Sequence, residues 1–280
     1  MTAIKLGLIG DNIAKSRAPV LHGLAGVQNS VAVTYDRLVP KDRGETFDQV
    51  FAACIKEGFR GINVTYPYKE RVAQGLRIDD PLVQAIGAVN TVIFHPDGPR
   101  GHNTDYSGFT AAYVRVRGIA PVGRVLMIGT GGVGRAVAFG LIALGVKDLA
   151  LVDRDLEKAE ALADDLRRAQ PDLTVSVGSN AVLAAAGAAG LINCTPVGMV
   201  GYDGTPLPKT AMAGAVWAFD AVYTPVETQF LTDAAAAGLQ IISGWELFFY
   251  QGVHAWEFFA GLPLDEDRLR QDLLNEGDAA

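Results

Sequence analysis

Short apolar runs alternate with amphipathic stretches along the first hundred residues. The runs IKLGLIG, VAVTYDRLV and GINVT are rich in β-branched residues. Between them lie residues 17–28 and 45–57, in which apolar positions recur at helical spacing. Parallel strands need long crossover connections, so this alternation predicts a parallel sheet covered by helices. We therefore expect a βαβαβ unit at the N-terminus.

A second alternating series begins at Arg124. Its apolar runs are VLMIG, LALVD, LTVSV, GLINC and VWAFDAVY, and helices are expected at residues 133–144 and 155–169. This pattern predicts a second doubly wound unit. We expect an α/β fold of two domains, the first formed by residues 1–104 and the second by residues 105–243.

The last 37 residues, from Gly244, predict two helices. The first, WELFFYQGVHAWEFFAG, is rich in aromatic side chains, and the second, EDRLRQDLLNE, is charged. Large apolar side chains lie nearly all round the first helix, so it must be buried. We expect residues 244–280 to complete the N-terminal domain.

Composition and charge exclude several classes of protein. The 280 residues are 49% apolar and 20% charged, which fits neither a disordered chain nor a fibrous repeat. The formal net charge of −7 repels phosphate backbones, and no run approaches the roughly 18 apolar residues of a membrane span. We therefore expect neither a nucleic-acid partner nor a membrane partner.

The cysteine and histidine residues give no sign of a metal site. Cys54 and Cys194 each lie in an apolar stretch, which predicts no disulfide framework and favours the cytoplasm. The four histidines show no metal-ligand spacing, and we expect no metal. We interpret His22 as a residue of a helix surface.

The strand VLMIG runs directly into a glycine-rich turn that opens a helix. Strand, glycines, helix and an acid at the end of the next strand together form the fingerprint of dinucleotide binding. The glycines allow a tight turn, close approach of the pyrophosphate and close contact between helix and sheet, while the helix start supplies N–H donors. The residues expected to bind the cofactor here are Gly129, Thr130, Gly131, Gly132, Val133 and Gly134.

Asp153 and Arg154 at the end of the run LALVD are expected to select the cofactor. A carboxylate there accepts hydrogen bonds from the adenosine ribose hydroxyls and repels a 2′-phosphate, which favours NAD over NADP. Arg154 complicates this interpretation, because an arginine can hold a phosphate or stack on adenine. We expect NAD, with NADP as the alternative. A cap for the following helix is the alternative role of Asp153.

Four further segments lie far apart in the chain: GINVTYPYK, GAVNTV, GHNTDYSGF and NCTPVGM. With the segment AVYTP and the late helix that carries Gln251, they resemble the shikimate dehydrogenase family over essentially the whole chain. The resemblance implies a substrate domain followed by a Rossmann domain. It also implies reversible hydride transfer between a nicotinamide cofactor and the ring carbinol of a cyclic hydroxy acid: shikimate, quinate or a close relative.

The resemblance assigns Lys69 and Asp105 as the catalytic pair. Oxidation of an alcohol removes the hydroxyl proton as hydride leaves the carbon, so a titratable group must touch that oxygen. Lysine suits this role when burial lowers its pKa, and Asp105 can bind the same hydroxyl and hold the ammonium. The sequence does not decide which of the two takes the proton. Asp105 could also cap a helix that starts at Tyr106.

The other residues implied by the resemblance fall into two groups. Neutral donors and acceptors suit a polyhydroxylated ring, and the implied substrate-binding residues are Ser16, Asn63, Thr65, Asn90, Tyr223 and Gln251. The further residues implied beside the cofactor are Thr195, Pro196, Ala221 and Gly244. The structural alternatives are hydrogen bonds in turns and at strand ends for Asn63, Thr65 and Asn90, and core packing for Tyr223.

The chain departs from the family pattern at two places. The family usually carries Ser-x-Ser-Pro, whose two hydroxyls bind the substrate carboxylate, but here Ala18 stands at the second serine. The lost hydrogen bond is worth about 1.5–3 kcal/mol, or one to two decades in affinity. Arg17 is an alternative donor, although we interpret it as an exposed charge. The second departure is the sequence Asp153-Arg154-Asp155, where NADP-dependent biosynthetic members show Asn-Arg-Thr.

The two departures together favour an NAD-using dehydrogenase of shikimate or quinate, a monomer or homodimer similar to family members that often serve catabolism. An amino-shikimate or otherwise modified analogue is the alternative substrate. A methylenetetrahydrofolate dehydrogenase shares the two-domain plan and the lysine, but the segment NTD and the Gln251 helix argue against it. A non-catalytic dinucleotide-binding sensor is the alternative from another class, and Lys69 and Asp105 argue against that.

Overall fold

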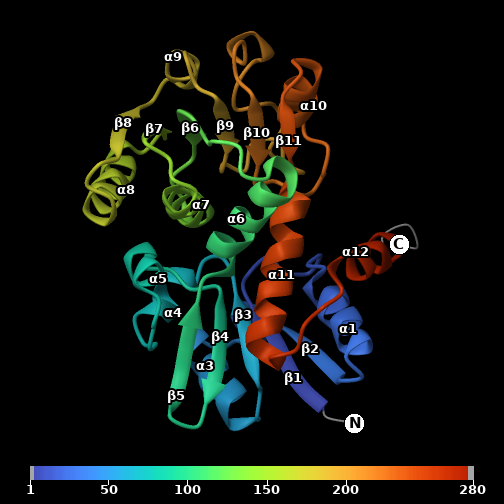
Figure 1. Cartoon of the computed structure of the whole chain (residues 1–280). Coiled ribbons are helices and arrows are strands. Elements are labelled where there is room, and N and C mark those ends of the chain that lie inside the picture. Colours follow the sequence, from blue (N-terminus) through green and yellow to red (C-terminus); the bar gives the residue numbers. More distant parts are fainter. Residues whose placement is uncertain (1–2, 277–280) are drawn as a thin grey trace. The chain divides into compact units, whose positions relative to one another are not determined.

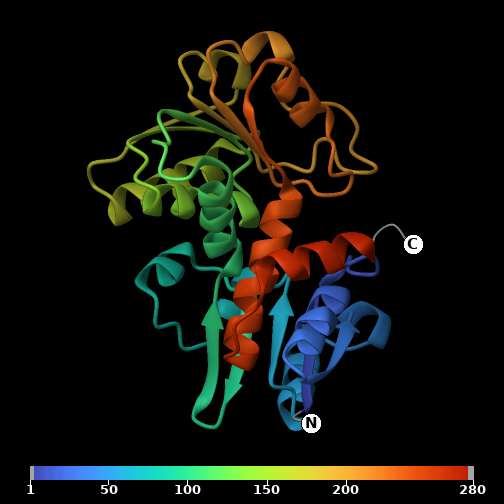
Figure 2. The ribbon, with the colours of Figure 1, turned by 45° about the vertical axis from the view of Figure 1, so that its right-hand side comes forward.

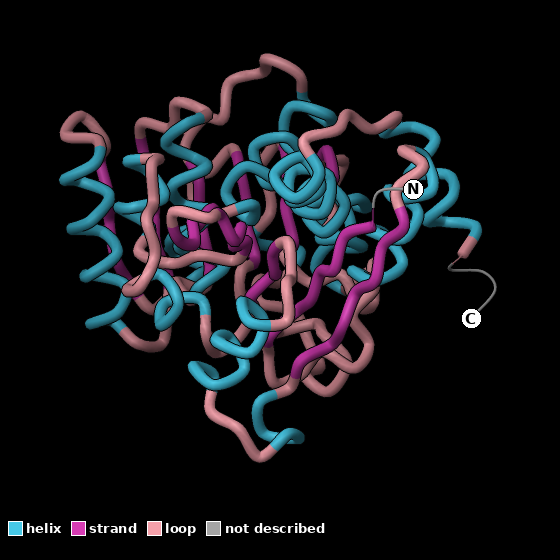
Figure 3. Tube along the Cα trace, turned by 90° about the horizontal axis from the view of Figure 1, so that it is seen from below, coloured by secondary structure: helices cyan, strands magenta, loops and turns pink. Residues whose placement is uncertain are grey.

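The structure is a computed structural model that describes residues 3–276. Its internal contacts divide the chain into two compact units. The first unit takes in the chain up to Thr104 and again from Gln251 onward, and the second comprises Asp105–Tyr250. Helices and strands alternate along most of the chain, as the colours of Figure 3 show.

The first unit contains a five-stranded sheet of order β2-β1-β3-β4-β5. Its strands are β1 (Ala3–Ile9), β2 (Ala32–Leu38), β3 (Gly61–Val64), β4 (Thr91–His95) and β5 (Gly98–His102). The strand β1 pairs in parallel with β2 and β3, which agrees with the predicted βαβαβ unit. The last two strands form an antiparallel hairpin (Figures 1 and 2), because two residues between them are too few for a crossover.

Among the described residues, the helices that lie wholly in the first unit are α1 (Ala18–Gln28), α2 (Pro40–Arg43), α3 (Phe47–Lys56), α4 (Lys69–Ala73), α5 (Pro81–Ile86) and α12 (Glu266–Asn275). The helix α3 starts at a capping box, in which Thr46 and Gln49 satisfy each other's backbone N–H groups. Its apolar face, which includes the buried Cys54, packs into the core.

The helix α11 (Gly244–Ala260) supplies residues to both units. In the first unit its Ala255 and Phe259 are buried in one cluster with Leu6 and Ile93 of the sheet. Packing of the late aromatic helix against the N-terminal strands is thereby confirmed.

His22 is buried, so its interpretation as a surface residue is wrong. Its side chain is 1% exposed and stacks on Tyr35, with 5.1 Å between ring centroids. Trp256 and Phe259 complete the surrounding aromatic cluster. Burial lowers the pKa of His22 to about 3, so the imidazole is neutral at ordinary pH.

The second unit contains a six-stranded parallel sheet of order β11-β10-β9-β6-β7-β8 (Figure 1). Its strands are β6 (Val125–Ile128), β7 (Asp148–Val152), β8 (Thr174–Gly178), β9 (Gly190–Asn193), β10 (Trp217–Asp220) and β11 (Gln240–Ile242). The strand order reverses between β6 and β9, which is the switch point where doubly wound sheets bind ligands. The predicted second doubly wound unit is confirmed.

The helix α6 (Thr104–Arg117) leads into β6. The helices that join the strands of this sheet are α7 (Gly132–Ala143), α8 (Leu156–Ala169), α9 (Ala181–Ala184) and α10 (Gln229–Ala236), with a 3₁₀ turn at Lys209–Ala211. The helices α7 and α8 agree with the predicted ranges to within one residue at each end. The helix α6 begins at Thr104, two residues before the expected start, because an amide side chain described below binds the N–H of Thr104.

Two glycines one turn apart in α1 provide a test of the packing between α1 and β2. A Cβ on Gly23 would meet no atom within 4 Å, so Gly23→Ala should raise the free energy of unfolding by about 0.5–1 kcal/mol. A Cβ on Gly26 would lie 2.5 Å from Val33 Cγ2, so Gly26→Ala should lower it by about 1–3 kcal/mol. Urea unfolding of both variants measures the difference, and equal effects would contradict this packing.

Candidate functional site

The segment after β3 carries Thr65 and Lys69. The N–H of Thr65 donates to Ile9 O at the end of β1 (2.9 Å), and the carbonyl of Thr65 accepts from Tyr68 N (2.9 Å). Lys69 is half-buried at the first position of α4, and its carbonyl accepts from Val89 N (2.9 Å). These bonds hold the predicted catalytic lysine between the end of β1 and the segment that precedes β4.

Asn90 joins three separate segments of the chain. Its side chain is 3% exposed, and its Oδ1 accepts from the backbone N–H of Thr104 at 2.7 Å. Its Nδ2 donates to Gln251 Oε1 at 3.4 Å. Asn90 therefore brings the predicted substrate residue Gln251 beside it, and it also fixes the start of α6. Asp105 is the next residue, 3% exposed in the first turn of that helix.

Asn63 lies within β3 and not in a turn. Its Nδ2 donates to Thr91 Oγ1 (3.0 Å) and to Asn90 O (3.3 Å), and its Oδ1 accepts from Tyr35 Oη (2.8 Å). The imidazole of His22 also hydrogen-bonds the Asn63 side chain, and this bond opposes the lowering of the His22 pKa by burial. The sequence analysis missed Tyr35, whose pKa is raised by burial, so that it stays a donor and fixes the orientation of this amide.

The loop after β1 carries Ser16 and its neighbour Arg17. The Oγ of Ser16 accepts from Ala18 N (3.3 Å), which leaves the hydroxyl proton to donate elsewhere. Arg17 is half-buried and donates to Leu273 O in α12 (2.6 Å). Its interpretation as an exposed charge is therefore wrong, and this bond occupies one of its guanidinium nitrogens.

The six predicted residues Ser16, Asn63, Thr65, Lys69, Asn90 and Gln251 all belong to the first unit. Hydrogen bonds join Asn63 to the Asn90 segment and Asn90 to Gln251 directly. The loop that leads to Ser16 begins beside the Thr65 segment, where Asp11 N donates to Tyr66 O (3.2 Å). The predicted residue Tyr223 lies in the second unit, half-buried and stacked on the ring of Phe248.

The glycine-rich turn follows β6 as predicted. Gly129 has a φ of +97°, which favours glycine, and a Cβ on Gly134 would lie 2.1 Å from Gly129 O. Gly131 is the N-cap of α7 and has no side chain with which to bind the first N–H groups of the helix. A Cβ on Gly132 would meet nothing within 4 Å. Uncapped donors beside open space at a helix start fit the pyrophosphate of a dinucleotide.

Asp153 follows β7 and is bound to the glycine-rich turn. Its Oδ2 accepts from both the N–H and the hydroxyl of Thr130, each at 2.7 Å. Burial of Asp153 opposes its ionisation, but the hydrogen bonds from Thr130, Asp155 and Arg154 together outweigh burial and lower the pKa of this carboxyl. Asp155 is the N-cap of α8, so the alternative in which Asp153 caps that helix is wrong.

Lys158 is a cation that the sequence analysis missed. Its Nζ lies 4.0 Å from the place that a Cβ on Gly131 would take, although Lys158 belongs to the first turn of α8. The sequence could have indicated this cation, because Lys158 lies three residues after the N-cap Asp155 and therefore in the first turn of α8, next to the glycine-rich turn. Arg154 is exposed in the same region.

The remaining predicted cofactor residues lie at the ends of β9 and β10. Thr195 donates through N–H and hydroxyl to Asn193 Oδ1, and Ala221 N donates to Asn193 O (2.8 Å). A Cβ on Gly244 would lie 2.4 Å from Val222 O, so α11 starts in close contact with the segment after β10. Pro196 follows Thr195 and is exposed.

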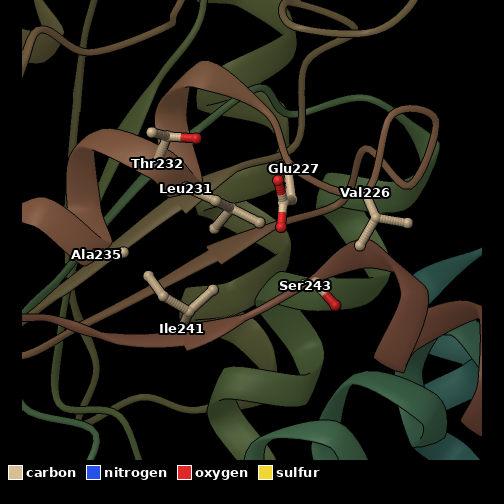
Figure 4. Close-up of a pocket in the computed structure, with 7 residues that line it drawn as sticks. All are labelled: Val226, Glu227, Leu231, Thr232, Ala235, Ile241 and Ser243. Atoms are coloured by element: carbon tan, nitrogen blue, oxygen red, sulfur yellow. The ribbon is translucent and has the colours of Figure 1, made fainter.

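A separate hollow of about 370 Å³ lies between α10 and β11 in the second unit (Figure 4). No predicted site residue lines it; its walls are Val226, Glu227, Leu231, Thr232, Ala235, Ile241 and Ser243. Within residues 3–276, no three His, Cys, Asp or Glu side chains gather as a metal site, and no helix is long and apolar enough to span a membrane.

The chain is similar to known proteins along its whole length. Residues 8–92 match a family model described as the shikimate dehydrogenase substrate binding domain. A quinate/shikimate dehydrogenase (NAD(+)) of Corynebacterium efficiens is 37% identical, and the match covers 98% of each chain. A shikimate dehydrogenase (NADP(+)) of Pseudarthrobacter chlorophenolicus is 36% identical, over 96% of this chain and 94% of that protein.

A solved structure shows the same similarity in three dimensions. Quinate dehydrogenase from Corynebacterium glutamicum in complex with NAD superposes on this chain with a TM-score of 0.92 at 34% identity. The superposition covers 98% of this chain and 100% of that structure.

Proposed function

Because the chain belongs to the shikimate dehydrogenase family, we propose that it catalyses reversible hydride transfer between NAD and the ring alcohol of quinate or shikimate. The observation that carries the proposal is the hydrogen-bonded group of Asn63, Asn90 and Gln251 with Lys69 fixed to the same segment. Neutral amides beside a titratable group are what a polyhydroxylated ring and its oxidation require.

The residues expected to contact the substrate take separate roles in this proposal. The cofactor, when bound, accepts a hydride from the carbinol carbon. Lys69 and Asp105 bind the hydroxyl on that carbon and transfer its proton, which returns to the oxygen in the reverse reaction. The amides of Asn63, Asn90 and Gln251, with Thr65, bind the other hydroxyls, and Ser16 donates to the carboxylate.

The second unit holds the cofactor in this proposal. The first-turn N–H groups of α7 bind the pyrophosphate, and Asp153 accepts from the ribose. Thr130 donates twice to Oδ2 of Asp153, Asp155 N donates to Oδ1 at 3.1 Å, and the lowered pKa keeps the carboxylate charged against a 2′-phosphate. This arrangement favours NAD. Arg154 and Lys158 are cations close enough to the site to keep NADP as the alternative.

We also propose that the two domains implied by the sequence have separate functions. Residues 1–104 with 244–280 form the substrate domain, and residues 105–243 form the dinucleotide-binding domain. Both cysteines are free thiols, which supports action in the cytoplasm. We propose that the chain acts as a monomer or homodimer.

The direct test is steady-state oxidation of quinate and shikimate with NAD and with NADP. We expect turnover with at least one of the acids, and a fall in kcat of about 10²–10⁴-fold for Lys69→Ala, the usual contribution of proton transfer by a positioned group. Lys56→Ala removes an exposed lysine from α3 and should behave as wild type. A wild type inactive on every ring acid and cofactor would contradict the proposed function, and an active Lys69→Ala would contradict the role of the lysine.

The cofactor assignment predicts a change of preference in Asp153→Asn. Asparagine still accepts from Thr130 but carries no charge against a 2′-phosphate, so the ratio of kcat/KM for NAD to that for NADP should fall about 10–100-fold. Asp164→Asn makes the same charge change at an exposed position of α8 and should leave the ratio unchanged. An unaltered ratio in Asp153→Asn would show that this carboxylate does not face the ribose.

The missing hydroxyl at Ala18 can be restored. The N–H of Ala18 lies 3.3 Å from Ser16 Oγ, so a serine at position 18 would add its hydroxyl close to the existing one. Ala18→Ser should lower the KM for shikimate about 10–100-fold, the value of one hydrogen bond to a charged acceptor. The KM for NAD is the internal control. An unchanged KM for shikimate would favour the second candidate substrate, an amino-shikimate or otherwise modified analogue.

A further inference from the structure

Two fully buried polar side chains end adjacent strands of the second unit. Asn193 is the last residue of β9, Asp220 is the last residue of β10, both are 0% exposed, and the two are paired in register. Neither belongs to the site residues that the sequence predicted. A buried amide or carboxylate is costly unless it is hydrogen-bonded, so the partners of these groups show what they hold in place.

The side-chain amide of Asn193 uses all of its hydrogen-bonding capacity. Its Nδ2 donates to Val197 O (3.0 Å) and to Asp220 Oδ1 (2.9 Å). Its Oδ1 accepts from the N–H (3.0 Å) and the hydroxyl (2.7 Å) of Thr195. Asn193 therefore fixes the turn that follows β9, and Asp220 fixes the orientation of Asn193.

The carboxylate of Asp220 also fixes the segment after β10. Its Oδ1 accepts from Val222 N (3.0 Å), and its Oδ2 accepts from the hydroxyl of Thr228 (2.6 Å). The oxygen of that hydroxyl accepts in turn from Leu231 N (3.2 Å), as the N-cap of α10. One carboxylate thus links the turn after β9, the segment after β10 and the start of α10.

The segments after β9 and β10 lie where we expect the nicotinamide half of the proposed cofactor to bind. The glycine-rich turn follows β6, and the proposed ribose ligand Asp153 follows its neighbour β7. A dinucleotide extends across the switch point over the carboxyl ends of the strands. With its adenosine half at β7, its other half must lie at β9 and β10.

We propose that Asp220 is a positioning residue for the nicotinamide half of the cofactor, and that only its ionised form holds the segments after β9 and β10 in the arrangement that binds this half. The inference rests on the proposed function of the chain as an NAD-dependent dehydrogenase.

Protonation of Asp220 would disturb the arrangement. Burial raises the pKa of Asp220 to about 6, although the bonds from Thr228, Val222 and Asn193 oppose the rise. Burial also raises the pKa of the neighbouring Cys194 thiol well above its ordinary value, so this group stays neutral. A protonated Oδ2 would donate to Thr228 and leave the Thr228 hydroxyl proton without its acceptor. Affinity for the nicotinamide half should therefore fall as the pH falls through about 6.

Calorimetric titration of the full chain with NAD and with ADP-ribose, which lacks the nicotinamide, tests this inference. At pH 7.5, Asp220→Asn should bind NAD roughly three- to tenfold more weakly than wild type, the effect of one lost hydrogen bond, and should bind ADP-ribose equally well. Between pH 8 and 5, the wild type should lose NAD affinity around pH 6 by a similar factor, and Asp220→Asn should not. Asp172→Asn, the same change at an exposed turn, should follow the wild type.

Several outcomes would overturn the inference. Equal weakening of NAD and ADP-ribose in Asp220→Asn would indicate a merely structural role, and unchanged NAD affinity or a surviving pH dependence would exclude the positioning role. Thr228→Ser keeps the hydroxyl and should bind NAD as wild type does, whereas Thr228→Val should bind it as Asp220→Asn does. A wild type that binds neither NAD nor ADP-ribose would overturn the proposed function and this inference with it.

Discussion

The side-chain amide of Asn90 is the group on which the candidate site of the first unit depends. It is almost fully buried, and a buried amide without partners costs free energy, so its bonds to Thr104 and Gln251 constrain where α6 begins and where α11 passes. The backbone beside it is bonded to Asn63 and, through Val89, to Lys69. One side chain and its neighbours thus fix four residues that are remote in sequence.

Buried polar side chains also fix loop segments in the second unit, at the ends of β9 and β10. An amide, Asn193, again binds a threonine of the following segment, but a carboxylate completes the group. The difference is chemical: the Asn90 group is neutral at every pH, whereas Asp220 titrates near neutrality because burial raises its pKa to about 6. In both units, polar side chains next to strands therefore order the loops of the proposed site. Only the group in the second unit contains a carboxylate, Asp220, that protonation can change.

Local patterns predicted most of this architecture. Periodicity predicted both alternating units and the buried late helix. The glycine pattern after β6 predicted a tight turn, and there the structure has no room for a Cβ at Gly129 or Gly134. The roles of Tyr35, His22 and Arg17 could not be predicted, because each depends on a partner from a distant element: Asn63, Trp256 and Leu273. Asn193 and Asp220 did carry a signal, since each is a polar residue that ends an apolar strand.

The central claim is that the residues around Asn90 hold a ring alcohol whose carbon gives up a hydride. Its most direct measurement uses quinate or shikimate deuterated at the reacting carbinol carbon, with mass spectrometry of the reduced cofactor after turnover. We expect each molecule of reduced cofactor to carry one deuterium, because hydride moves directly from carbon to cofactor without exchange with water. Reduced cofactor without deuterium would contradict it.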